Sequence, residues 1–137
     1  MISPTAEQVF ELSDYFGNLA NLIGEYIDFN KGNMTLDERN KLYDAEIDLS
    51  RFAGEINMIG VDLVFEDVKA LLAQLEIITQ GVKNAVKKAL AVQDAITIAS
   101  DLVTIGTAIV SLDPKAVVES TINFGKNLKA SSKSTEG

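Results

Sequence analysis

The chain has 137 residues and a formal net charge of −8, and it contains no Cys, His or Trp. This length suffices for one domain with a substantial buried core. The missing Cys excludes disulfides, thiolate zinc sites and thiol nucleophiles, and the missing His removes the commonest general base near neutral pH. The acidic balance argues against binding to nucleic acids, which select basic surfaces. We therefore expect a protein that is not an enzyme and holds no metal or other cofactor.

The charge is divided unevenly along the chain. Residues 1–67 hold 14 acidic and 4 basic side chains, a net charge of −10, while residues 68–137 hold 6 and 8, a net charge of +2. One acidic and one near-neutral face of a single bundle would explain this, and the alternative is an acidic half that meets a basic partner. The N-terminus lacks the basic start of a secretory signal. We expect a cytoplasmic protein. The alternative is export by a route that needs no signal sequence.

The first helix is predicted over residues 4–28. Ser3 is a favoured N-cap residue and Pro4 is favoured at the first helical position. Apolar residues then recur with 3-4 spacing and form a stripe wide enough for a bundle core. Gly17 and Gly24 lie seven residues apart on one face, where we expect a neighbouring helix to approach closely.

A second helix is predicted over residues 36–59, after a short turn rich in Asn and Gly. Thr35 and Glu38 have the spacing of a capping box, which marks a helix start. The two helices match in length, so we expect an antiparallel hairpin. The register of the apolar positions changes at Gly60. This change predicts that the helix ends there and that Asp62 caps the next helix.

The 3-4 apolar spacing resumes and continues through residues 62–111, which predicts a long buried helical stripe. One helix of that length would measure about 75 Å, too long for a domain of this size. Gly81 follows Thr and Gln as in a typical C-terminal cap. We therefore expect two helices, over residues 62–80 and 82–111, with one uninterrupted helix as the alternative.

The last helix is predicted over residues 114–129. Asp113 and Pro114 end the preceding helix and cap this one. The composition of residues 130–137 predicts a disordered tail, so that one domain spans residues 1–129. The fold class is all-α, an up-and-down bundle of four to five helices. The residues of the last helix expected in the core are Val117, Val118, Ile122 and either Phe124 or Leu128.

Residues 89–112 are the unusual part of the chain, because 16 of 24 positions are Ala, Val, Ile, Leu or Gly. The polar residues among them recur every three or four positions and form one narrow stripe. A basic flank precedes this segment. The apolar positions of interest are Ile96, Val103, Ile105, Ile109 and Val110; the polar stripe includes Asp94, Thr97, Asp101 and Thr104; the basic flank is Lys83, Lys87 and Lys88.

Three interpretations of this segment compete. It could be the central helix of the bundle, an interface with another molecule, or a helix that enters a membrane conditionally. Its length suffices for a membrane span, but Asp94 and Asp101 each oppose insertion by about 2.5–3.5 kcal/mol. The many β-branched residues would suit a short hairpin instead, yet the 3-4 polar stripe favours a helix.

The function expected is that of a non-enzymatic interaction or assembly protein. It would self-associate as a homo-oligomer, or bind a protein partner, through apolar helix surface. The alternative is a membrane-active protein that inserts the helix over residues 89–112. The third interpretation is an enzyme or small-molecule binder. In it, Asp94 and Asp101 would face the hydroxyls of Thr97 and Thr104 in a buried cavity.

Overall fold

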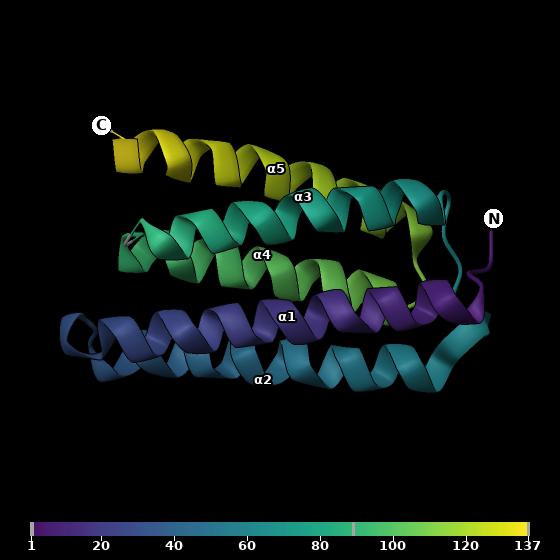
Figure 1. The fold of residues 1–137 in the computed structure, drawn as a ribbon, viewed down its shortest axis with the longest axis horizontal. Coiled ribbons are helices and arrows are strands. Elements are labelled where there is room, and N and C mark those ends of the chain that lie inside the picture. The colour runs from purple at the N-terminus through teal and green to yellow at the C-terminus, as the bar shows by residue number, and fades with distance from the viewer. Residues whose placement is uncertain (1, 89, 137) are drawn as a thin grey trace.

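Five helices account for the fold of this protein in a computed structural model, which describes residues 2–88 and 90–136 and side chains as far as Leu128. The helices are α1 (Ala6–Asn30), α2 (Leu36–Ile59), α3 (Val68–Lys87), α4 (Val92–Val110) and α5 (Pro114–Glu136). They run alternately up and down one long axis (Figure 1), which confirms the all-α up-and-down bundle. The α1–α2 hairpin forms one side of the bundle, α3 and α5 form the other, and α4 packs against both α2 and α5.

Helix α1 begins two residues later than predicted. Its N-cap is Thr5, whose hydroxyl accepts from the backbone N–H of Gln8 at 3.2 Å, while the Gln8 side chain accepts from the Thr5 N–H at 2.9 Å. This capping box satisfies two backbone donors at once, which Ser3 followed by Pro4 does not offer. Pro4 is instead buried ahead of the helix.

Helix α2 begins where the sequence predicts. The Thr35 hydroxyl accepts from the Glu38 backbone N–H at 3.1 Å, and the Glu38 carboxylate accepts from the Thr35 N–H at 2.9 Å. A single 3-10 turn, Lys31–Asn33, closes the hairpin between α1 and α2. Helix α2 ends at Gly60, whose φ of +62° is a conformation that favours glycine.

The third helix begins at Val68, so the predicted start at residue 62 is wrong. After the 3-10 turn Gly60–Asp62, an extended segment buries Leu63 and Phe65 and exchanges two backbone hydrogen bonds, of 2.7 and 2.9 Å, between Phe65 and Ile2. The cap is Asp67, whose carboxylate accepts from the Ala70 N–H at 3.0 Å. Buried Leu63 and Phe65 alternate with Val64, which is half-buried, and Glu66, which is exposed. This period of two is typical of extended chain.

The predicted break at 80–82 is also wrong, because α3 continues through Gly81 to Lys87. Gly81 is half-buried against the side chain of Leu128. The chain turns after Lys88 instead, and Leu90, buried to 5% exposure, accepts a hydrogen bond at its carbonyl from the Tyr26 hydroxyl. Burial, and then the charge of Asp94, raise the pKa of Tyr26. A contact between distant segments thus lies at this helix end, beside local backbone hydrogen bonds from Lys88 and Leu90 to Ala85. Ala89 lies outside the described residues.

Helix α5 begins as predicted. The Asp113 carboxylate accepts from the Ala116 N–H at 3.1 Å, and Pro114 is the first helical residue. The backbone is helical as far as Glu136, which is longer than the predicted helix over residues 114–129. The disordered tail predicted for residues 130–137 stays a prediction, because the side chains beyond Leu128 and the whole of Gly137 lie outside the described part.

Aromatic rings pack in the core where α1, α2 and α4 meet. The rings of Phe16 and Phe52 contact edge to face, with centroids 6.2 Å apart. Gly106 of α4 faces the Phe52 ring, and a Cβ at this position would overlap the ring atoms. Gly17 has no such neighbour within 4 Å, contrary to the expected close approach, and at Gly24 the neighbour is only the end of the Glu46 side chain.

Candidate functional site

The apolar candidates on α4 divide between the core and the half-buried edges of the bundle. Ile105 and Ile109 are 0% and 1% exposed, so no partner can reach them in this fold. Ile96, Val103 and Val110 are half-buried and pack against the core. Helix α4 therefore lies between its neighbours, and it presents no continuous apolar face to the outside.

The polar stripe of α4 lies along the outer edge of the helix. Thr97 and Thr104 are exposed, and each hydroxyl donates to the carbonyl oxygen four residues earlier, at 3.1 and 3.0 Å. Asp101 is half-buried and accepts from the Asn127 amide of α5 at 2.6 Å. Asp94 is half-buried one turn before Thr97. Asp94 and Asp101 lie seven residues apart, about 10 Å along the helix, so the stripe does not bring them together as an acid–base pair.

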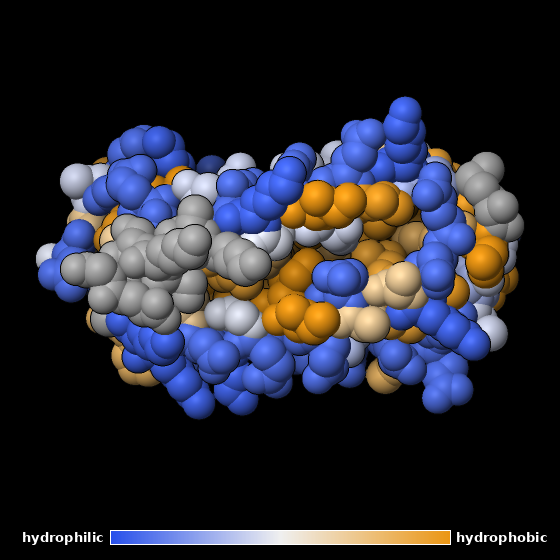
Figure 2. Space-filling model, turned by 90° about the horizontal axis from the view of Figure 1, so that it is seen from above, coloured by the Kyte–Doolittle hydropathy of each residue, from blue (hydrophilic) through white to orange (hydrophobic). Residues whose placement is uncertain are grey.

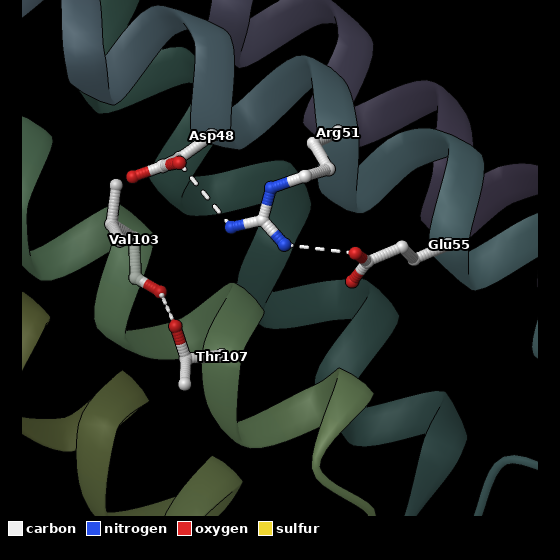
Figure 3. Close-up of polar contacts among 5 residues, drawn as sticks. All are labelled: Asp48, Arg51, Glu55, Val103 and Thr107. Atoms are coloured by element: carbon white, nitrogen blue, oxygen red, sulfur yellow. Dashed lines mark hydrogen bonds and ion pairs between the residues drawn. The ribbon is translucent and has the colours of Figure 1, made fainter.

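Beside this stripe, an ion-pair cluster on α2 involves residues that the sequence did not single out (Figure 3). The Arg51 guanidinium donates to Glu55 at 2.8 Å and to Asp48 at 3.2 Å, and these bonds raise the pKa of Arg51. Across from it, the Thr107 hydroxyl donates to the Val103 carbonyl at 2.9 Å. Each charged group in the cluster has a partner within it, so the cluster is a structural surface network.

The basic flank lies at the C-terminal end of α3. Lys83 and Lys87 line a hollow of about 870 Å³ between α1 and α3, and Lys88 follows the helix end. Amide side chains of α1, together with Glu25 and the exposed ring of Phe29, form the opposite wall. This wall combines polar side chains with the apolar Leu22 and Phe29, and the basic flank borders α1 rather than α4.

A surface that the sequence analysis missed lies between α3 and α5. Two adjoining hollows of about 220 and 500 Å³ share Gln74, Thr121 and Ile122 as lining residues, and together they form a continuous channel that we call the α3–α5 groove. Figure 2 looks down on this side and shows a hollowed band of apolar residues between polar borders. The apolar lining is Phe65, Ala70, Leu71, Ile77, Ile78, Pro114, Val117, Val118, Ile122, Phe124 and Leu128; the rest is Glu66, Asp67, Gln74, Thr121, Gly125 and Lys126.

The groove is open because α5 packs on α4 and only touches α3. Helix α5 packs far more extensively on α4 than on α3, and no side-chain hydrogen bond joins α3 and α5 as far as side chains are described. Val117 and Phe124, seven residues apart, bury against the core. Val118 and Ile122 were expected there too, but they are 39% and 55% exposed, and Ile77 of α3 is 62% exposed.

The sequence did hold a signal for this groove. The apolar residues of α5 include neighbours in sequence, such as Val117 and Val118, which point about 100° apart on a helix. They therefore cover more of its circumference than one supporting helix can bury.

Two further tests of the described residues concern metals and membranes. Within the described residues, no group of three or more Asp, Glu, His or Cys side chains could hold a metal ion. In the same part of the chain, one helix, α4, is long and apolar enough to cross a membrane by length and composition, and 44% of that stretch is buried inside the bundle. The core helix of a bundle meets the same criteria.

Comparison of the chain with protein-family models, with curated proteins and with solved structures gave no match in any of the three.

Proposed function

We propose that this protein is a non-enzymatic assembly module that binds another protein chain in the α3–α5 groove. The single observation that carries the proposal is the open apolar groove itself, with Val118, Ile122 and Ile77 exposed along it. Contiguous exposed apolar surface with polar borders is typical of interaction sites. A helix laid between two helices, with its apolar face inward, is a recurrent way to cover such a groove.

The groove is the surface we favour over α4, where sequence analysis placed the interface. A partner at α4 would have to displace α2 or α5 to reach Ile105 and Ile109, which are buried. A partner in the α3–α5 groove covers side chains that are already exposed. Binding there requires no opening of the core.

A photo-crosslinking amino acid placed at Ile122 tests this proposal in the cells that make the protein. We expect covalent adducts with protein chains after illumination, because this side chain lies in the middle of the groove. The matched control is the same substitution at Ile47, an isoleucine of α2 that is 62% exposed and lies outside the groove. Adducts from both positions alike, or from neither, would contradict the proposal.

A second candidate is a membrane-active protein that inserts α4, and the length and apolar composition of this helix favour it. Insertion would require α4 to leave its contacts with α2 and α5. Flotation with vesicles of phosphatidylcholine and phosphatidylglycerol at pH 7 and pH 4.5 is the test. Flotation at either pH would support it; a protein that stays with the aqueous phase at both pH values would dismiss it.

A further inference from the structure

We infer that the occupant of the α3–α5 groove is a second copy of this chain, related to the first by a two-fold axis that lays the two α5 helices antiparallel. The inference rests on the proposed function and names the partner. Its support comes from the charges that line the groove, from the residue spacing on α5, and from the placement of charge over the whole chain.

The charges that line the groove have opposite signs at its two ends. Glu66 and Asp67 lie at the end where α3 begins, and Lys126 lies at the other end. All three are exposed. A two-fold axis through the middle of the groove would bring the acidic end of each copy to the basic end of its partner, because such an interface is self-complementary. One ion-pairing site would then form at each end.

Four of the residues by which α5 lines the groove have the spacing that this arrangement needs. Pro114, Val118, Ile122 and Lys126 recur every four residues along the groove, so they lie on one side of the helix. In an antiparallel pair centred at the level of residue 120, Val118 of one copy faces Ile122 of the other. Lys126 then lies level with Pro114, beside which Asp67 lines the same hollow. The two ends are separated by about 18 Å along the helix.

The placement of charge over the whole chain allows two copies to meet on this side. Residues 1–67 carry a net charge of −10, and residues 68–137 carry +2. The α1–α2 hairpin lies on the opposite side of the bundle from α3 and α5 (Figure 1). Two copies joined through the α3–α5 groove would therefore have their acidic hairpins on the outside of the dimer. There, distance and salt weaken the electrostatic repulsion between the two hairpins.

Charge reversal in the purified protein tests the pairing of the groove ends. Lys126→Glu should raise the dimer dissociation constant about tenfold, because it replaces an attraction by a repulsion at both ends. Glu66→Lys should do the same, and the double variant should return to within about threefold of the wild type. Lys115→Glu is the matched control, since it makes the same charge change on α5 at a residue outside the groove lining. A double variant as weak as the single variants would overturn the pairing.

Single cysteines test the two-fold axis, and the chain suits this test because it has no Cys of its own. Thr121→Cys lies within about 3 Å of the axis level, so mild oxidation should give a covalent dimer in high yield. Asn123→Cys, on the same helix but outside the groove lining, should give little. Equal yields from the two positions would overturn the proposed geometry.

Failure of this inference can be told from failure of the proposed function. If the purified protein remains a monomer while the crosslinker at Ile122 captures other proteins in cells, the second copy is wrong and the groove still serves a foreign partner. If neither dimer nor adduct forms, both proposals are wrong. A dimer that Thr121→Cys traps and Lys126→Glu weakens supports both.

Discussion

At the scale of single residues, Gly106 packs closely against the ring of Phe52. Gly106→Ala should lower the free energy of unfolding by about 1–3 kcal/mol, because the added methyl group must displace a ring that is itself held against Phe16. Urea denaturation measures this change.

Gly17→Ala is the matched control, because it adds the same methyl group to a helix with no neighbouring atom within 4 Å. It should raise the free energy of unfolding by about 0.5–1 kcal/mol, the ordinary gain from replacing glycine inside a helix. Loss of stability at Gly17, or none at Gly106, would refute this account of the packing. The heptad pattern placed Gly106 on the buried stripe, but it contained nothing to identify Phe52 as the residue opposite.

A second prediction at this scale concerns pH. The Tyr15 hydroxyl of α1 donates to the Glu76 carboxylate of α3 at 2.6 Å, and this bond, with burial, raises the pKa of Tyr15 to about 12 from an ordinary value of 10.0. Because the folded pKa is the higher one, the stability from this contact is fully present below pH 10 and is lost as the pH rises toward 12.

The melting temperature of the wild type should therefore fall more steeply between pH 10 and 12 than that of Tyr15→Phe. Tyr26 and Tyr43 are present in both proteins, so their ionisation contributes equally to the two curves. Parallel curves over this range would show that the Tyr15–Glu76 bond contributes nothing to stability.

At the scale of elements, local capping signals predicted the starts of α2 and α5, but the side-chain caps at Thr5 and Asp67 were missed. Thr35 and Asp113 mark starts that follow from local capping chemistry. The boundary after Lys88 has no glycine or proline to mark it in the sequence, and the Leu90 carbonyl just beyond it accepts from the distant Tyr26 hydroxyl. Gly81, which does resemble a cap, is tolerated inside α3 beside Leu128.

The start of α3 supplies a test at this scale. Asp67→Ala should lower the free energy of unfolding by about 1 kcal/mol, since it removes the side chain that accepts from the Ala70 N–H. Asp67→Asn, which keeps an acceptor oxygen but removes the charge, should retain most of that stability. Asp62→Ala, at the start that the sequence predicted, should change it by less than about 0.5 kcal/mol. A larger effect at Asp62 than at Asp67 would be evidence for the longer helix.

At the scale of the whole molecule, the periodicity predicted the bundle but misplaced its exposed apolar surface. The apolar composition of residues 89–112 drew attention to α4, yet a helix that contacts neighbours on two sides needs that composition simply to be buried. The α3–α5 groove forms from residues more than 40 positions apart, such as Ile77 and Ile122. These residues come together because of the way α5 packs against α4. No periodicity within one helix contains that information.

The most direct test of the groove as an assembly surface is the solution mass of the purified protein by light scattering over a dilution series. We predict a dimer that dissociates on dilution, and for Ile122→Glu a monomer under the same conditions, because two carboxylates would be buried in the contact. Ile47→Glu, the same substitution at an exposed isoleucine of α2, should leave the dimer intact. A wild type that is monomeric at every concentration, or a dimer that survives Ile122→Glu, would contradict the account of the groove as the contact between two copies of the chain.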